Sequence, residues 1–287
     1  MRKIDLHLHT TASDGSDTPR ELLRLAKEVG LTVISVTDHD TLAGCIEAIN
    51  IPECGVKVIT GIEFSCHHCG ECDFDCHILG YGFDPESPEL LGAIAHGREM
   101  RLAKLEARLE YLYTRFGIRF DGEELEWLHS LNSVARPHLG SLLVKRGVAK
   151  DMAEAMDTYL KGDGFPDDRI DAAEAIDAIA KAGGISVYAH PLGGERERRL
   201  TREELSPRVD ALRRLGLGGL ECYYSRYSSE DSALLSELAE ERGLLKSAGS
   251  DYHGKNKTVE LGRLSSDSDS GSVDATVLSA LPDIYTL

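Results

Sequence analysis

Hydrophobic and polar positions along the chain predict short strands that alternate with longer helices. Runs rich in β-branched residues at 2–8, 33–37 and 56–64 are predicted strands. Between the first two, Thr18 and Pro19 supply the N-cap and first-turn proline of an amphipathic helix. This alternation is typical of βα units built around a parallel sheet.

The alternation is interrupted after a hairpin-like segment that ends near Tyr81. A long helical pattern covers 88–116, and from there to about Asp171 the sequence predicts only helices and turns. Strands and helices then alternate again as far as about Ala248. We therefore expect an α/β fold in two parts, 1–85 and 172–287, separated by a helical insertion at 86–171.

The composition argues mainly against two kinds of partner, membranes and extended nucleic acids. Hydrophobic residues make up 41% of the 287 positions, and the mean hydropathy is −0.24. No apolar run reaches the roughly 18 residues of a membrane span, and the N-terminus lacks a signal-peptide pattern, so we expect a cytoplasmic protein. The net charge of −17 disfavours membranes and extended nucleic-acid tracks as partners.

Residues able to bind metal ions follow the predicted strands with unusual regularity. His7 and His9 are spaced i, i+2 on one strand, so both side chains face the same side and can reach one ion. In barrels of alternating strands and helices, active sites form at the carboxyl ends of the strands. The candidate ligands are His7, His9, Asp14, His39, Glu63, His77, His190, Asp251 and His253.

Each of these residues has an ordinary structural interpretation when it is taken alone. A histidine at a strand end is more often packed or hydrogen-bonded than a ligand, and Asp38 or Asp40 can cap the next helix. The repetition after successive strands is harder to explain by packing. It favours a site for several metal ions, whose imidazole and carboxylate ligands suit Mn, Zn or Fe.

Five motifs resemble those of the PHP (polymerase and histidinol phosphatase) family. They are Asp5-Leu6-His7-Leu8-His9-Thr10 with Ser13-Asp14-Gly15, Thr37-Asp38-His39-Asp40, Gly61-Ile62-Glu63-Phe64-Ser65, Ala189-His190-Pro191 and Gly249-Ser250-Asp251-Tyr252-His253. The resemblance spans essentially the whole chain and agrees in order, spacing and strand context. It implies a distorted (β/α)7 barrel, two or three divalent metal ions and hydrolysis of phosphate esters.

The resemblance also implies how three ions would share these ligands. It assigns to the first ion His7, His9, Glu63 and Asp251, to the second Glu63, His77 and His190, and to the third Asp14, His39 and His253. Two ions about 3.5–4 Å apart can share a water, lower its pKa and supply a bridging hydroxide that attacks phosphorus. Asp38 or Asp40 is expected to hold His39 or a neighbouring histidine, and Asp38 is expected to take part in catalysis.

The predicted insertion contains a motif suited to phosphate. The segment 134–139, Val-Ala-Arg-Pro-His-Leu, resembles the one that grips phosphate in the small-molecule branch of the family. The planar guanidinium of Arg136 fits phosphate, and His138 is the expected general acid, although Arg136 and Pro137 also suit a helix start. Ser225 and Arg226 follow a later predicted strand and are further candidates for substrate binding.

Four cysteines lie between two of the predicted ligands. Cys66, Cys69, Cys72 and Cys76 have the C-x2-C-x2-C-x3-C spacing of ferredoxin-type iron–sulfur sites. No proline follows the fourth cysteine, and in a hairpin Cys76 would point away from His77. An iron–sulfur cluster, a zinc ion and plain thiols all stay open as interpretations.

These features predict a phosphoric ester hydrolase for a small phosphorylated metabolite, either a nucleotide bisphosphate, a sugar phosphate or a cyclic phosphodiester. Residues 161–168 are more acidic than the matching turn of the nucleotide bisphosphate phosphatases, which leaves that substrate open. The alternative is a 5′-end exonuclease acting on short RNA or DNA, which needs only a few phosphate contacts. An iron–sulfur or redox module built on the four cysteines is a third interpretation.

Overall fold

The computed structural model describes residues 3–52, 55–70, 72–195, 197–267 and 273–281. The chain divides into two compact units, one formed by Met1–Ile94 with Ile170–Leu287 and the other by Ala95–Arg169. The second unit lies within the predicted insertion at 86–171. The helical pattern at 88–116 is confirmed as α3 (Pro88–Phe116), which contains the first boundary between the units.

The larger unit contains two sheets. A parallel sheet has the order β1-β2-β3, with β1 at Ile4–Leu8, β2 at Val33–Val36 and β3 at Lys57–Ile59. The second has the order β6-β4-β5-β7-β8-β9. Its strands are β4 (Gly61–His68), β5 (Phe74–Tyr81), β6 (Ile170–Asp171), β7 (Ile185–Tyr188), β8 (Gly219–Tyr224) and β9 (Leu245–Gly249).

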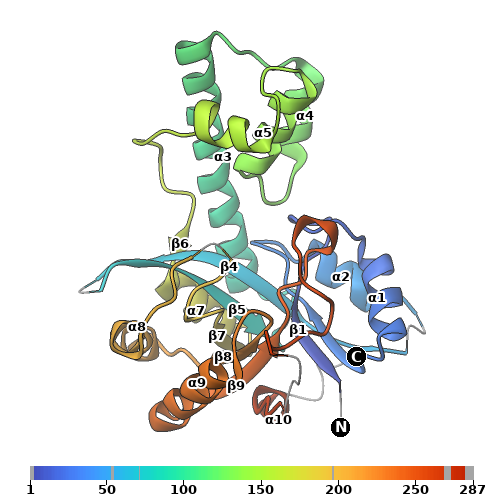
Figure 1. Cartoon of the computed structure of the whole chain (residues 1–287), viewed down its shortest axis with the longest axis vertical. Coiled ribbons are helices and arrows are strands. Elements are labelled where there is room, and N and C mark those ends of the chain that lie inside the picture. The colour runs from blue at the N-terminus through green and yellow to red at the C-terminus, as the bar shows by residue number, and fades with distance from the viewer. Residues whose placement is uncertain (1–2, 53–54, 71, 196, 268–272, 282–287) are drawn as a thin grey trace. The chain divides into compact units, whose positions relative to one another are not determined.

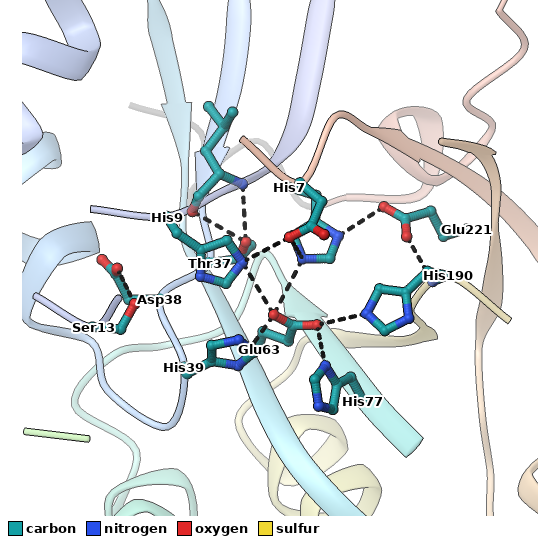
Figure 2. Close-up of polar contacts among 12 residues, drawn as sticks. His7, His9, Ser13, Thr37, Asp38, His39, Glu63, His77, His190 and Glu221 are labelled. Atoms are coloured by element: carbon teal, nitrogen blue, oxygen red, sulfur yellow. Dashed lines mark hydrogen bonds and ion pairs between the residues drawn. The ribbon is translucent and has the colours of Figure 1, made fainter. Parts of the chain in front are cut away.

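The two sheets meet where the end of β1 lies beside the segment after β9 and where the segment after β2 lies beside β4. Leu8 forms a bridge with Tyr252 just after β9, and His39 forms one with Glu63 on β4. Both sheets therefore contribute residues to one region, which Figure 2 shows in close-up. The α/β class is confirmed, and the closed (β/α)7 barrel stays a prediction.

Helices cover the outer faces of these sheets (Figure 1). Leucines and alanines of α1 pack with apolar side chains of β2, β3 and the helix that follows β2. The predicted Thr18 cap is confirmed, because its hydroxyl accepts from the Glu21 amide in a capping box. Besides the first part of α3, the described helices of this unit are α1 (Pro19–Glu28), α2 (Ala43–Ile49), α7 (Ala172–Lys181), α8 (Arg202–Arg214), α9 (Ser229–Arg242), η2 (Gly254–Asn256) and α10 (Val277–Ala280).

The predicted single strand at 56–64 is wrong, because the chain changes sheets at Thr60. β3 ends before this residue and pairs with β2, whereas β4 begins after it and pairs with β5. The Thr60 hydroxyl donates to the Phe83 carbonyl at 3.0 Å. Gly61 allows a close approach, since a Cβ there would lie 2.0 Å from the Ser35 hydroxyl. β5 is antiparallel to both β4 and β7, so the larger sheet is mixed.

The smaller unit is helical and has its own apolar core. This core includes Leu112, Leu128, Leu139 and Leu143, which are buried. Besides the second part of α3, the unit contains α4 (Gly122–Ser130), α5 (Arg136–Lys145), α6 (Met152–Glu154) and the π-helix η1 (Ala155–Tyr159). None of the described helices is long and apolar enough to cross a membrane.

Candidate metal centre

A buried carboxylate, Glu63 of β4, lies at the middle of a ring of imidazoles. Its Oε2 atom is 3.2 Å from Nε2 of His7, 3.1 Å from Nε2 of His9 and 3.2 Å from Nδ1 of His39. Figure 2 shows these rings pointing toward Glu63 from β1 and from the segment after β2. The i, i+2 spacing of His7 and His9 thus brings both rings to one oxygen, as the strand pattern predicted.

The other oxygen of Glu63 contacts two further histidines. Oε1 is 2.9 Å from Nδ1 of His77 and 3.3 Å from Nε2 of His190. His77 lies on β5, which runs antiparallel to β4 and pairs it with Ser65. The hairpin therefore returns an imidazole to the same face of the sheet as Glu63 (Figure 2).

Asp251 lies two residues after β9, and its two carboxylate oxygens contact different groups. Oδ1 faces the rings, 3.6 Å from Nε2 of His7 and 3.5 Å from Nε2 of His9. Oδ2 accepts a hydrogen bond from the Tyr224 hydroxyl at 2.9 Å and pairs with Nζ of Lys257 at 2.8 Å. Tyr224 and Lys257 therefore orient the carboxylate while Oδ1 stays directed at the histidines.

Asp14 contacts a second group of imidazoles, next to the group around Glu63. Its Oδ1 is 3.6 Å from Nδ1 of His9 and 3.2 Å from Nε2 of His253, and its Oδ2 is 4.0 Å from Nε2 of His39. Four residues, His9, Asp14, His39 and His253, have ligand atoms within 4.8 Å of one another. This group contains the three residues assigned to a third ion and adds His9 to them.

The donor atoms of the centre fit divalent cations. Within the described part of the chain, several of them are buried and make no hydrogen bond, which is costly unless another partner satisfies them. These atoms are His7 Nε2, His9 Nδ1, His9 Nε2, His39 Nδ1, Glu63 Oε2 and His253 Nε2. Nitrogen and carboxylate oxygen are ligands that suit Zn, Mn and Fe.

The pKa values of these groups are coupled through Glu63. Burial alone would raise the pKa of Glu63, but the charges of His39, His7 and His77 outweigh it and hold the pKa well below its usual range. Burial favours the neutral ring of His9, whose pKa is lowered well below normal. For His7, burial is outweighed by Glu63 and a second carboxylate, Glu221, so its pKa is raised.

Glu221 of β8 is a residue of the centre that the sequence did not predict. Its Oε1 is 2.9 Å from Nδ1 of His7, and its Oε2 accepts the backbone N–H of His190 at 2.7 Å. One buried carboxylate thus orients two of the candidate ligands. Its sequence signal is weak, since it is a single acid at an inward position of a predicted strand, outside any of the five motifs.

The backbone around the centre adopts left-handed conformations at residues that are not glycine. The φ angles are 53° at Asp40, 30° at His190 and 60° at Asp251. Such angles are uncommon outside glycine, although Asp and His adopt them more readily than most residues, and they often occur at functional sites. At Gly249 the constraint is the space for a side chain, because a Cβ at this position would lie 2.1 Å from Cβ of His7.

Comparison with known families decides the identity of this arrangement. The model of the PHP domain matches residues 5–181, which is more than half of the chain. The chain belongs to the PHP family. The matched range contains His7, His9, Glu63 and His77, so the family model covers the residues that surround the Glu63 carboxylate.

Three curated relatives of this PHP protein are named for the phosphate esters that they cleave. The chain is 32% identical over 271 residues to a 5'-3' exoribonuclease of Haemophilus influenzae, which covers 91% of this chain and 94% of the relative. It is 34% identical over 261 residues to the phosphoribosyl 1,2-cyclic phosphate 1,2-diphosphodiesterase of Eggerthella lenta. This match covers 88% of this chain and 94% of the relative. It is 32% identical over 262 residues to the 3',5'-nucleoside bisphosphate phosphatase of Chromobacterium violaceum, covering 88% of each. The chain is a metal-dependent phosphoric ester hydrolase.

Asp38 of this PHP protein contacts a loop rather than a histidine. Its Oδ1 accepts from the Thr10 amide at 2.7 Å and from the Ser13 hydroxyl at 2.6 Å, and its Oδ2 accepts from the Thr10 hydroxyl at 2.7 Å. Gly44 makes room for it, since a Cβ there would lie 2.0 Å from Oδ2. The prediction that Asp38 holds a histidine is therefore not supported, and these contacts instead position the loop that carries Asp14.

The predicted phosphate-binding residues of the insertion lie at a helix start in the smaller unit. Arg136 is at the first position of α5, and the predicted helix start is confirmed. Nδ1 of His138 accepts the Ala135 amide at 3.0 Å. A neutral His138 ring in this geometry carries its proton on Nε2. The part that either residue takes in catalysis stays a prediction.

The four cysteines of the hairpin do not come together. Cys66 and Cys76 pair across β4 and β5 and are buried, whereas Cys69 and Cys72 lie beyond the end of β4. In the part of the hairpin that the structure describes, the group with ligand spacing is His67, Cys69 and Asp73. The ferredoxin-type interpretation of the cysteine spacing is therefore not supported by this arrangement of the PHP chain.

Proposed function

We propose that this PHP enzyme hydrolyses a small phosphorylated metabolite with two or three divalent metal ions as cofactors. A nucleotide bisphosphate, a sugar phosphate and a cyclic phosphodiester are the substrate classes that we expect. The observation that carries the proposal is the meeting of five imidazoles on Glu63 next to Asp14 and Asp251. Several of these donors are buried and make no hydrogen bond within the described residues, as expected of metal ligands.

The ligand assignment for three ions is compatible with the distances between the side chains. Glu63 can contact both the first and the second ion, because its two oxygens face different histidines. We assign to the first ion His7, His9, Glu63 and Asp251, to the second Glu63, His77 and His190, and to the third Asp14, His39 and His253. When bound, Mn, Zn or Fe ions at these ligands would activate a shared water at neutral pH and neutralise phosphate charge.

Arg136 is proposed to bind the phosphate group. Its charge acts on Arg108 in the smaller unit, and Arg108 is only 9% exposed. Burial, followed by the charge of Arg136, lowers the pKa of Arg108. Two guanidinium groups held near each other favour the binding of an anion between or beside them.

His138 is proposed to protonate the leaving oxygen. Since the Ala135 amide donates to Nδ1, the proton of the neutral ring is on Nε2, the nitrogen that lies away from this amide. To act as a general acid, His138 must first take up a second proton on Nδ1, so the ring must give up the hydrogen bond that Nδ1 accepts from Ala135. The imidazolium then donates its Nε2 proton and returns to the neutral form. A general acid of this kind contributes about 10²–10⁴-fold to the rate when the leaving group is a poor one.

Ser225 and Arg226 are proposed as further contacts to the substrate. The Ser225 hydroxyl is buried and makes no hydrogen bond within the described residues, and it follows Tyr224, which orients Asp251. Arg226 forms an ion pair with Glu195 at 3.0 Å. Binding of a phosphate by Arg226 would therefore have to replace this pair, which makes Ser225 the better supported of the two.

A 5′-end exonuclease acting on short RNA or DNA is the second candidate. The match to the Haemophilus influenzae relative, named as an exoribonuclease, covers 94% of that relative. In addition, residues 95–169 contain 12 Lys and Arg against 13 Asp and Glu, so nearly all of the net charge of −17 lies elsewhere. A short oligonucleotide could meet this less acidic unit without strong repulsion.

A substrate screen separates the two candidates. Phosphate release would be measured with one metal-analysed preparation on a nucleoside bisphosphate, a sugar phosphate, a cyclic phosphodiester and 5′-phosphorylated oligonucleotides of increasing length. We expect the highest kcat/KM on one of the small compounds and a weak dependence on salt. A kcat/KM that rises with oligonucleotide length and falls steeply with salt would overturn this and support the exonuclease.

A further inference from the structure

The hairpin that carries Glu63 and His77 continues past the metal centre toward a second group of ligand-type side chains. β4 and β5 pair His67 with Asp75, two positions beyond the pair of Ser65 with His77. Because side chains alternate along a strand, His67 lies on the same face as Glu63, about 13 Å further along at roughly 3.3 Å per residue. The tip of the hairpin is therefore a separate place from the catalytic centre.

Three side chains of different chemistry converge at this tip. His67, Cys69 and Asp73 each offer one ligand atom, and these atoms lie within 4.8 Å of one another. Nε2 of His67 lies 3.1 Å from Oδ1 of Asp73. A tetrahedral zinc ion with ligands at about 2.0–2.3 Å keeps its donors roughly 3.3–3.8 Å apart, so small side-chain rotations suffice.

Asp75 holds His67 in the way that carboxylates hold metal-binding histidines. Nδ1 of His67 is 2.8 Å from Oδ1 of Asp75, on the side of the ring away from Asp73. A neutral ring in this geometry donates its Nδ1–H to Asp75 and directs the Nε2 lone pair toward Asp73 and Cys69. Two acceptors, Nε2 and the Asp73 carboxylate, would then face each other at 3.1 Å and need a cation between them.

The sequence around the tip contains acidic residues and no Lys or Arg. Residues 58–97 contain no Lys or Arg, whereas Asp73 and Asp75 are both within the tip. The Asp73 side chain is 67% exposed and the His67 side chain is 23% exposed, so an ion in solution can reach them. The group is therefore accessible, unlike the buried Cys66 and Cys76 on the other face of the hairpin.

We propose that His67, Cys69 and Asp73 bind one transition-metal ion of the zinc type at the hairpin tip, with Asp75 as the positioning residue for His67. The mixture of imidazole, thiolate and carboxylate favours Zn²⁺ or Co²⁺ over Mg²⁺ and Ca²⁺, which prefer oxygen ligands only. The competing explanation needs no metal. In it, a protonated His67 forms ion pairs with both Asp73 and Asp75.

Cobalt spectroscopy distinguishes a metal ion from a proton at this site. The full-length protein would be stripped with a chelator and titrated with Co²⁺ while its absorption is recorded. A thiolate-to-cobalt charge-transfer band reports a cysteine ligand, and the ligand groups of the catalytic centre contain no cysteine. The variants are Cys69→Ser and Asp73→Asn, with Cys72→Ser as the matched control in the same loop.

We expect the charge-transfer band in the wild type and in Cys72→Ser, its loss in Cys69→Ser, and weaker Co²⁺ binding at the tip in Asp73→Asn. Cys69→Ser should keep its thermal stability without metal and its phosphate release, because the catalytic ligands are untouched. His7→Asn should conversely keep the band, which makes the test independent of the proposed function. Absence of the band in the wild type, or its loss in Cys72→Ser and retention in Cys69→Ser, would overturn the proposal.

Discussion

Nδ1 of His7 lies 2.9 Å from Oε1 of Glu221, on the side of the ring away from Glu63 (Figure 2). Both side chains are fully buried. Because a neutral imidazole carries one N–H, this contact places the proton on Nδ1 and leaves the Nε2 lone pair for a cation. Glu221 also accepts the His190 amide at 2.7 Å, so one carboxylate orients a ligand on β1 and a ligand in the segment after β7.

Glu221→Gln is therefore expected to weaken metal binding by about 10–100-fold, the usual effect of removing an orienting carboxylate. An amide offers one acceptor oxygen, so it cannot serve both His7 and the His190 backbone as the carboxylate does. Metal titration by calorimetry measures the effect. Glu260→Gln, at a position whose side chain is 82% exposed, is the matched control and should bind as the wild type does. Unchanged affinity in Glu221→Gln would contradict this role.

Metal uptake is expected to release protons, and its affinity should increase with pH. Burial lowers the pKa of His7, but Glu63 and Glu221 outweigh it and raise the pKa above the usual 6.5. The metal-free protein thus keeps a proton on His7 that an ion must displace, so apparent affinity rises as pH rises through this raised pKa and then levels off. Calorimetry in buffers of different ionisation enthalpy counts the protons. A pH-independent affinity and no proton release would refute the prediction.

Asp38→Asn tests whether Asp38 positions a loop or transfers a proton. The carboxylate accepts three hydrogen bonds from Thr10 and Ser13, and an amide cannot accept all three. Losing a buried bond of this kind costs about 1–3 kcal/mol, so we expect a lower Tm and weaker binding of the ion at Asp14. Ser13→Ala removes one of these bonds and should give a smaller change of the same kind. If the pH profile of kcat shifts in Asp38→Asn, Asp38 takes part in proton transfer instead.

His138→Asn should slow hydrolysis according to the leaving group. With an alkyl phosphate the loss of a general acid is expected to cost about 10²–10⁴-fold in kcat. With a nitrophenyl ester, whose leaving oxygen needs no proton, the rate should change little. His129→Asn is the control, because His129 lies in the same unit and pairs with Glu106. An equal loss on both substrates would assign His138 to binding or folding rather than to acid catalysis.

The candidate ligands could be predicted from the sequence because each lies on a strand or in the segment that follows one. The alternation of His7 and His9, and the acids Asp14 after β1 and Asp251 after β9, are local patterns that need no knowledge of the fold. The meeting of these patterns on Glu63 is what the structure adds. Strand ends are thus the part of the centre that local sequence encodes.

The orienting residues could not be predicted in the same way. Glu221 is 214 positions from His7, and nothing in the local sequence separates it from an ordinary buried acid. The switch of sheets at Thr60 likewise depends on its bond to the Phe83 carbonyl and on the space beside Ser35, which are contacts between distant segments. The contacts of Asp38 could not be predicted either, because the Thr10–Ser13 loop folds back over it.

The most direct test of the metal centre is phosphate release by the wild type and by Glu63→Gln, each with its metal content measured in the same sample. The substitution keeps the size of the side chain but removes the charge that faces five histidines. We predict that the metal-loaded wild type hydrolyses a small phosphate ester, and that the variant loses about 10²-fold or more in kcat/KM together with bound metal. Equal rates in the two proteins at equal metal content would contradict the account.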